Sequence, residues 1–261
     1  MVMYSDNEMM AIAAGRLIKD GDIVFAGTGV SMLAATAAKR IHAPGAVVFF
    51  ETGGIDPALD EIPMTVADLR VMSGTSLNSG LIEAFSTVGH RKLRTIAFLG
   101  AAQIDRYGNL NTTSIGDYHK PKKRFSGSGG ACDVASLASG VITFMQHDKR
   151  RFVEKLDYLT SVGWYKGGNS RQELGLRRGG AMAVVTNLGV LRFHDKTKEM
   201  YLAEYFPAVT VEQIRKNTGF PIDASGAKEA LLPTAEELRV LREEVDPQRL
   251  ICQSNNEKPP G

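Results

Sequence analysis

The sequence predicts an α/β fold: a single open, mainly parallel sheet flanked by helices, with some antiparallel strands in the C-terminal third. Short apolar runs at residues 23–26 and 47–50 each lead into a glycine-containing turn. Continuous apolar runs of this length are typical of strands buried on both faces of a parallel sheet. Apolar residues at helical spacing precede the first run and also lie between the two runs, so helices are expected there.

The chain of 261 residues is long enough for one large domain, and no linker-like stretch divides it. We therefore expect a single domain over residues 1–252. Residues 253–261 form a polar end that closes on Pro-Pro-Gly, and this tail is predicted to be disordered.

The composition narrows the classes of function. A hydrophobic fraction of 43% and a charged fraction of 23% are ordinary for a soluble globular protein. The net charge of +2 is too small to indicate a nucleic acid or an anionic membrane as a partner. Cys132 and Cys252 form no CxxC pair and no secretory signal is visible, so we expect a cytoplasmic location. The five histidines are scattered, so no metal site is expected.

Helix signals occur along the whole chain. Ser5 or Asp6 can cap a first helix that starts near Glu8. Thr210 and Thr234 can cap two later helices, because each is followed three residues on by Gln or Glu, as in a capping box. Further helices are predicted at 31–40, within 75–89 and at 131–138.

Further strands are predicted at 95–99, 141–145, 158–162, 183–186, 189–193 and 200–203, with one more within 110–115. The last three alternate with turns, which indicates antiparallel pairing. Residues 166–180 are basic and rich in glycine, so a long loop is expected there.

Glu51 directly follows the apolar run 47–50 and precedes Gly53 and Gly54. Open α/β sheets bind ligands at the carboxyl ends of their strands, so Glu51 is a candidate functional carboxylate. The glycine pair permits a sharp turn and a close approach of the backbone to a ligand. The alternative is a carboxylate that leaves the sheet and sits in water or in an ion pair.

Two glycine-rich turns are candidate anion sites. Gly27-Thr28-Gly29 lies between a predicted strand and a predicted helix, and Gly127-Ser128-Gly129-Gly130 opens the segment 131–138. Such turns present backbone N–H groups and a helix N-terminus to an anion, although they can also serve only close packing. The first turn is not a dinucleotide fingerprint, because Met32 stands where the third glycine is needed.

Two other features have both a plain and a functional interpretation. The basic cluster at 119–124 is either a solvated loop or a contact to ligand phosphates. Cys132 follows a glycine-rich turn, a position that can lower the pKa of a thiol. A small buried cysteine is the favoured interpretation.

Six runs carry a resemblance to a known family: GTG at 27–29, FETGG at 50–54, GAAQIDRYGNLNTTSIGDYHKPK at 100–122, RFSGSGGA at 124–131, QHDKRRF at 146–152 and KLDYLTSVGW at 155–164. In these runs the chain closely resembles the B-type subunits of the class I coenzyme A transferases. The runs are spread over nearly the whole length, and the block from 100 to 131 is long and distinctive.

The resemblance implies roles for particular residues. The catalytic residue of the family is a glutamate at the end of a strand, in a short E-(S/T/N)-G motif, and Glu51 matches it. The family's GxGGA element matches 127–131 and lies along the bound pantetheine, with the GTG turn on the other side of the site. The resemblance thus implies CoA-binding or oxyanion-stabilising roles for Gly27, Gly29, Val30, Gly127, Gly129 and Gly130.

The resemblance also implies a reaction. CoA would move between an acyl-CoA, such as acetyl-CoA, and a dicarboxylic acid such as glutaconate, through a covalent glutamyl-CoA thioester on Glu51. Coenzyme A would be a co-substrate, no tightly bound cofactor is expected, and an A-type partner subunit would be required. The alternatives are an acyl-CoA hydrolase or decarboxylase of the same fold, whose relatives lack this glutamate at the motif, and a non-catalytic ligand-sensing subunit.

Overall fold

The computed structural model describes residues 3–253, which divide into two compact units. Unit 1 holds the described residues up to Ile96 and from Leu232 onward, and unit 2 holds Ala97–Leu231. Strand β5 (Thr95–Gly100) carries the chain from the first unit into the second. The single domain over 1–252 stays a prediction, and the predicted tail at 253–261 lies, apart from Gln253, outside the described residues.

The strands of unit 1 begin with a parallel pair. β1 (Ile23–Phe25) and β2 (Val47–Phe49) run side by side, and Phe25 lies opposite Phe49. Two short antiparallel strands follow, β3 (Gly54–Ile55) and β4 (Leu77–Asn78). β1 and β2 are the two strands predicted from the apolar runs, whereas the two-residue strands β3 and β4 were not predicted.

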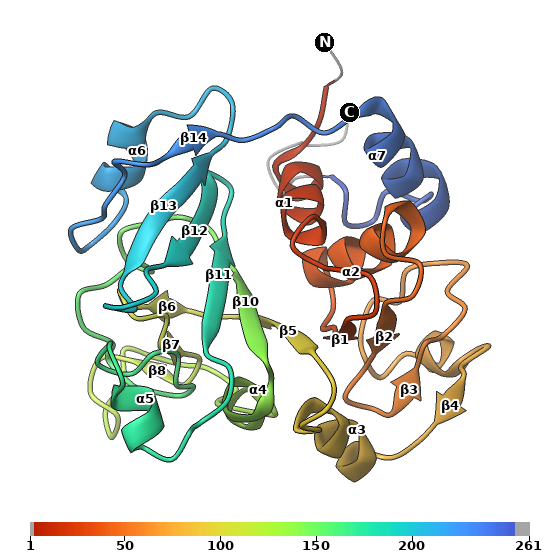
Figure 1. Ribbon diagram of the computed structural model, residues 1–261, viewed down its shortest axis with the longest axis horizontal. Helices are drawn as coiled ribbons and strands as arrows, with labels where there is room; N and C mark the ends of the chain where they lie inside the picture. The colour runs from red at the N-terminus through yellow and green to blue at the C-terminus, as the bar shows by residue number, and fades with distance from the viewer. Residues whose placement is uncertain (1–2, 254–261) are drawn as a thin grey trace. The chain divides into compact units, whose positions relative to one another are not determined.

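The helices of unit 1 include both predicted N-terminal ones, α1 (Asp6–Gly15) and α2 (Val30–Ile41), which pack against each other (Figure 1). Gly15 permits this close packing, because a Cβ there would lie 3.1 Å from the Ala34 carbonyl oxygen. Ser5 caps α1 as predicted, and Glu8 completes a capping box that was not predicted. The remaining helical segments of unit 1 are η1 (Leu69–Met72), α3 (Leu81–Val88), α7 (Ala235–Arg239) and η2 (Val240–Val245).

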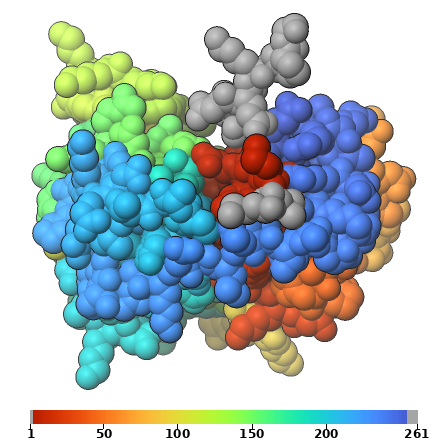
Figure 2. Space-filling view, turned by 90° about the horizontal axis from the view of Figure 1, so that it is seen from above, coloured from red at the N-terminus to blue at the C-terminus, as the bar shows by residue number. Residues whose placement is uncertain are grey.

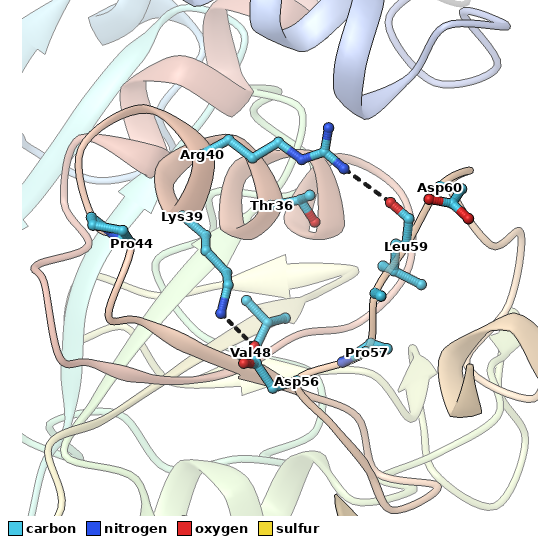
Figure 3. Close-up of a pocket in the computed structure, with 10 residues that line it drawn as sticks. Thr36, Lys39, Arg40, Pro44, Val48, Asp56, Pro57, Leu59 and Asp60 are labelled. Carbon is cyan, nitrogen blue, oxygen red and sulfur yellow. Dashed lines mark hydrogen bonds and ion pairs between the residues drawn. The ribbon is translucent and has the colours of Figure 1, made fainter. Parts of the chain in front are cut away.

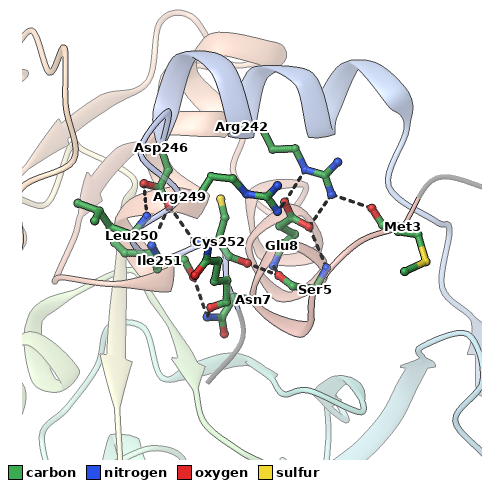
Figure 4. Close-up of polar contacts among 11 residues, drawn as sticks. Met3, Ser5, Asn7, Glu8, Arg242, Asp246, Arg249, Leu250, Ile251 and Cys252 are labelled. Carbon is green, nitrogen blue, oxygen red and sulfur yellow. Dashed lines mark hydrogen bonds and ion pairs between the residues drawn. The ribbon is translucent and has the colours of Figure 1, made fainter. Parts of the chain in front are cut away.

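The C-terminal part of unit 1 returns to the N-terminal helix. In Figure 2 the red residues of α1 and the dark blue residues of α7 and η2 lie side by side. The fully buried Glu8 carboxylate accepts hydrogen bonds from Arg242 Nε and Nη2 at 2.6 and 2.8 Å (Figure 4). The Asp246 carboxylate accepts hydrogen bonds from the backbone N–H groups of Leu250, Ile251 and Cys252. These contacts explain why the last part of the chain belongs to unit 1.

Besides β5, the sheet of unit 2 contains five strands: β10 (Gly140–Phe144), β11 (Ala181–Val185), β12 (Gly189–Phe193), β13 (Met200–Tyr205) and β14 (Lys228–Glu229). Their order in the sheet is β14-β13-β12-β11-β10-β5. β10 and β11 are parallel, β11 to β13 pair antiparallel as predicted, and β14 is parallel to β13. The α/β fold class with antiparallel strands in the C-terminal third is therefore confirmed.

Short elements complete unit 2. The helices are α4 (Ala131–Leu137), α5 (Ser170–Glu173) and α6 (Val211–Lys216), and the small two-stranded sheets are β6 (Gln103–Ile104) with β7 (Leu110–Asn111) and β8 (Ser114–Ile115) with β9 (Lys123–Arg124). The strand predicted at 158–162 is wrong, because this segment makes only an isolated bridge between Leu110 and Ser161. No helix in residues 3–253 is long and apolar enough to cross a membrane.

The loop predicted at 166–180 contains α5 and a buried cation. The Arg171 side chain is 1% exposed, and its guanidinium donates to the backbone carbonyls of Val162 and Gly163, each at 2.8 Å, and of Ala135 at 2.8 Å. Burial lowers the pKa of Arg171 to about 10. The carbonyl oxygens compensate the charge, so Arg171 joins the loop to α4.

Candidate active site

Glu51 lies one residue beyond Phe50 at the carboxyl end of β2, as predicted. The N–H of Ala26 donates to the Phe49 carbonyl at 3.0 Å, which continues the parallel register past the ends of β1 and β2. Neighbouring strands lie about 4.8 Å apart, and parallel strands end at the same edge of a sheet. The Gly27-Thr28-Gly29 turn and Glu51 therefore leave the sheet next to each other.

The backbone around Glu51 is held firmly, while its carboxylate is not. The N–H of Phe50 donates to the Gly54 carbonyl at 3.1 Å, and the N–H of Gly53 donates back to the Phe50 carbonyl at 3.0 Å. Thr52 Oγ1 donates to the Val66 carbonyl at 2.8 Å. The half-buried Glu51 carboxylate makes no hydrogen bond or ion pair with any residue in 3–253, so the ion-paired alternative does not apply there.

Gly53 and Gly54 bring the backbone of the Glu51 turn close to another segment of the chain. Gly53 has a φ of +101°, and a Cβ there would lie 2.0 Å from the Ser79 carbonyl oxygen. A Cβ on Gly54 would lie 2.1 Å from the Val71 carbonyl oxygen. The close approach of a ligand to this pair stays a prediction, and both glycines seat the Glu51 turn on the segment 71–79. No motif pointed to Ser79 or Val71.

The Gly27-Thr28-Gly29 turn presents a row of backbone donors. Gly29 is the N-cap of α2 with a φ of +75°, and nothing lies within 4 Å of the place where its Cβ would be. The N–H groups of residues 27–30 donate to no group within the described chain. The turn is held through its carbonyls, since Ser31 Oγ donates to Thr28 at 2.9 Å and the Met32 N–H to Gly29 at 3.0 Å. Four such donors at the N-terminus of a twelve-residue helix favour a negatively charged group.

The second glycine-rich turn lies in unit 2 and leads into α4. Gly127 and Gly129 have positive φ, and no atom lies within 4 Å of either Cβ position. Thr112, which lies in the run 100–122 but was given no role there, fixes the turn: its carbonyl accepts from the Gly127 N–H at 3.1 Å, and its Oγ1 donates to the Gly127 carbonyl at 2.7 Å. The N–H groups of Gly129 and Gly130 donate to nothing in residues 3–253. That this turn faces Glu51 stays a prediction.

Cys132 and the basic cluster at 119–124 both lie in unit 2. Cys132 is exposed, so the prediction of a small buried cysteine is wrong. The reason is that α4 buries Val134 and Ala135 and turns its first residues outward. The basic cluster at 119–124 is largely exposed and ends in β9, where the Arg124 guanidinium lies over the Tyr118 ring.

His147 is buried among side chains of unit 2, and its contacts are those of a structural residue. Its ring stacks on Phe152 with a centroid distance of 4.0 Å and forms hydrogen bonds with the hydroxyls of Thr186 and Thr218. Burial lowers its pKa to about 4. Across residues 3–253, no three His, Cys, Asp or Glu side chains gather in a way that could hold a metal ion.

A cavity of about 330 Å³ lies in unit 1 between α2 and the loop 56–60 (Figure 3). Neither Glu51 nor the Gly27-Thr28-Gly29 turn lines it. Its cations are engaged by the protein: Lys39 Nζ lies 2.6 Å from the Asp56 carboxylate, and Arg40 donates to the Leu59 and Glu244 carbonyls. These two cations therefore hold the loop 56–60 against α2, and the cavity is not part of the candidate site.

Several known proteins are similar to this chain in sequence and in fold. Residues 7–217 match the family described as Coenzyme A transferase. The chain is 43% identical over 263 residues to the B subunit of glutaconate CoA-transferase from Acidaminococcus fermentans, with 96% of both chains covered. It is 40% identical over 245 residues to the B subunit of 3-oxoadipate CoA-transferase from Pseudomonas knackmussii, with 93% of this chain and 94% of that protein covered.

The crystal structure of glutaconate coenzyme A-transferase from Acidaminococcus fermentans matches this fold with a TM-score of 0.92 at 43% identity. The match covers 96% of this chain and 98% of the other. The family match alone spans well over half of the sequence. The chain therefore belongs to the coenzyme A transferase family.

Proposed function

We propose that this chain is the B-type subunit of a CoA-transferase that moves CoA between an acyl-CoA, such as acetyl-CoA, and a dicarboxylic acid such as glutaconate. The observation that supports this most strongly is the Glu51 carboxylate. It stands at the carboxyl end of β2, beside four unengaged N–H groups, and no group in residues 3–253 neutralises it. A carboxylate kept free in such a place is available as a nucleophile.

The proposed reaction exchanges one thioester for another. A Glu51 oxygen attacks the carbonyl carbon of the acyl-CoA, the carbon–sulfur bond breaks, and CoA leaves as a thiolate. The thiolate then attacks the side-chain carbonyl of Glu51, which releases the first carboxylate and leaves a glutamyl-CoA thioester. The incoming carboxylate reverses these two steps and departs as the new acyl-CoA. Atoms and charge balance, because one carboxylate enters for each that leaves.

Each step passes through a tetrahedral oxyanion that needs hydrogen-bond donors. The N–H groups of Gly27, Gly29 and Val30 are proposed as such donors, and so are those of Gly129 and Gly130. Gly127, with open space above its Cα, is proposed to let CoA pass close to the backbone. Removing one such donor typically slows an enzyme by about 100- to 1,000-fold.

The substrate and partner are carried over from the relatives. One relative is named for glutaconate and another for 3-oxoadipate, both of which are dicarboxylic acids, and both relatives are named as the B subunits of their enzymes. We therefore propose an A-type partner subunit, coenzyme A as a co-substrate and no tightly bound cofactor. A reducing cytoplasm remains the expected location.

The test is transfer activity of the chain co-expressed with the A-type subunit of the same organism, assayed with acetyl-CoA and a panel of dicarboxylic acids. Glu51→Gln removes the nucleophile at nearly constant volume and is expected to abolish transfer. Glu51→Asp withdraws the carboxylate by about 1 Å and is expected to lower the rate of CoA transfer roughly 100-fold. Glu229→Gln, at an exposed position on β14, is the matched control and should transfer normally. Full transfer by Glu51→Gln would show that Glu51 is not the nucleophile, whereas no transfer by the unchanged complex would favour the hydrolase, decarboxylase or sensing alternatives.

A further inference from the structure

Another cavity, of about 350 Å³, lies within unit 2 where β11 begins, beside the hairpin of β12 and β13. Its volume lies in the range of small-molecule sites. Neither glycine-rich turn lines it, so the reaction proposed above does not use it. We call it the β11 cavity. The charged and aromatic residues that carry the argument below are Trp164, Arg192, Asp195, Lys198 and Tyr201, all of which line it.

Arg192 supplies the β11 cavity with a half-buried cation. It lies opposite Tyr201 in the pairing of β12 with β13, and its neighbour Leu191 lies in the hydrophobic core opposite Leu202. Because side chains alternate along a strand, Arg192 and Tyr201 share the other face of the sheet. Among residues 3–253, the Arg192 guanidinium has no hydrogen-bond, ion-pair or ring partner. Its paired N–H donors are therefore available to the oxygens of a carboxylate or phosphate group.

Trp164 and Lys198 form a fixed part of the cavity wall. Trp164 Nε1 donates to the Ala181 carbonyl at 2.7 Å, and a Cβ on Gly180 would lie 2.6 Å from the nearest atom of the indole ring. Lys198 Nζ lies 4.4 Å from the ring centroid, and Lys198 has no ion pair in the described part of the chain. The ring holds the ammonium group in place without neutralising its charge.

The hairpin that carries Lys198 is tied to the loop that carries Trp164. The Gly168 N–H donates to the Thr197 carbonyl at 3.1 Å, and a Cβ on Gly167 would lie 2.5 Å from the same oxygen. The Lys198 N–H closes the hairpin by donating to the His194 carbonyl at 3.0 Å. Folded structure therefore positions the cation before any ligand arrives.

The charges and the size of the β11 cavity indicate the class of ligand. Asp195 also lines it, but this carboxylate is exposed and makes no ion pair within residues 3–253. Arg192 and Lys198 thus outnumber the carboxylate, which favours a negatively charged ligand. A volume of about 350 Å³ equals that of roughly twelve water molecules, more than a lone phosphate or carboxylate group fills. Trp164 and Tyr201 offer apolar surface to the rest of such a molecule.

We propose that the β11 cavity binds a small organic anion. Its carboxylate or phosphate group contacts Arg192 and Lys198, and its apolar body packs against Trp164 and Tyr201. This site goes beyond the proposed function and does not rest on it, because binding there requires neither Glu51 nor CoA transfer.

The test is calorimetric titration of the full chain at constant ionic strength with phenyl phosphate and with benzoate, which carry the same ring on the two kinds of anionic group. At least one of them is expected to bind saturably at one site per chain, and the tighter one identifies the anionic group. Inorganic phosphate lacks the ring and benzyl alcohol lacks the charge, so each should bind about 10-fold more weakly or worse. Trp164 is the only tryptophan of the chain, so its fluorescence should change with the same affinity.

Three variants assign the binding to the β11 cavity. Arg192→Gln should weaken binding by about 10-fold or more, because it removes a charge-assisted hydrogen bond. Lys196→Gln is the matched control, since Lys196 is an exposed cation of the same hairpin that does not line the cavity, and it should bind within about 2-fold of the unchanged chain. Asp195→Asn removes a repelling charge and should tighten binding by about 2- to 5-fold, a gain that misfolding cannot produce.

The inference would be overturned if neither ring-bearing anion bound saturably, or if Arg192→Gln and Asp195→Asn both bound like the unchanged chain. It would also be overturned if acetyl-CoA displaced the bound anion from the complex with the A-type subunit at its own KM for transfer, because the cavity would then belong to the CoA site. If the complex transfers no CoA while the chain binds the anion through Arg192, the proposed function fails and the β11 cavity stands as a binding site.

Discussion

Gly53→Ala is the substitution that tests most sharply how the nucleophile is positioned. The new Cβ would lie 2.0 Å from the Ser79 carbonyl oxygen, and reaching an ordinary contact of 3.4 Å requires a shift of about 1.4 Å. An alanine at a φ of +101° adds backbone strain of about 1–2 kcal/mol, and the clash adds about 1–3 kcal/mol. We therefore expect the free energy of unfolding to fall by about 2–5 kcal/mol.

Gly21→Ala separates these two contributions. Gly21 has a φ of +79° and no atom within 4 Å of its Cβ position, so only the backbone strain of about 1–2 kcal/mol applies. Urea unfolding of the isolated full chain, followed by circular dichroism, measures both variants. A shift of about 1 Å at Glu51 should also lower transfer by roughly 100-fold in Gly53→Ala alone. Equal stability and equal transfer in the two variants would refute the claim that Ser79 fixes the Glu51 turn.

Two further predictions concern stability. Glu8→Gln leaves Arg242 without its buried counter-charge and should cost about 3–5 kcal/mol in urea unfolding. Glu236→Gln, which breaks the exposed pair with Arg239, should cost much less; similar losses would show that burial of the pair is unimportant. His147 has a pKa of about 4 in the folded chain against an ordinary value of 6.5, so lowering the pH through this window protonates the unfolded chain first. Stability should therefore fall as the pH drops from 6.5 to 4, by up to about 3 kcal/mol, and His147→Gln should remove that part of the pH dependence. An unchanged pH profile in His147→Gln would contradict the buried neutral imidazole.

The elements that could be predicted are those whose signals are local. The run at 47–50 predicts β2, and a capping side chain at Ser5 or Asp6 predicts the first helix, which begins at Asp6. The capping boxes at Thr210 and Thr234 are also confirmed. A capping side chain lies close in sequence to the backbone group that it binds, and a buried strand shows its own apolar run. Neither prediction needs tertiary information.

The features that could not be predicted depend on distant contacts. Glu8 is buried because Arg242 reaches it from 234 residues away. Arg171 is buried because five carbonyl groups from three segments surround it, although its local sequence indicates a loop. Two-residue strands such as β4 are too short to show a period of two.

The glycines show the same limit most clearly. Gly29 and Gly53 both have positive φ in glycine-rich turns, yet one faces open space and the other faces the Ser79 carbonyl. The sequence alone does not distinguish them. The choice of Glu51 as nucleophile likewise depended on resemblance to a family, since the strand pattern alone left a solvated or ion-paired carboxylate open as the alternative.

The most direct test of the central claim is chemical trapping of Glu51. The complex with the A-type subunit is incubated with an acyl-CoA, treated with borohydride or hydroxylamine, and its peptides are mapped by mass spectrometry. The account predicts inactivation together with a reduced or hydroxamate-modified side chain at Glu51, and no modification in Glu51→Gln. A complex that transfers CoA at full rate while Glu51 stays unmodified, or while the label falls on another residue, would contradict it.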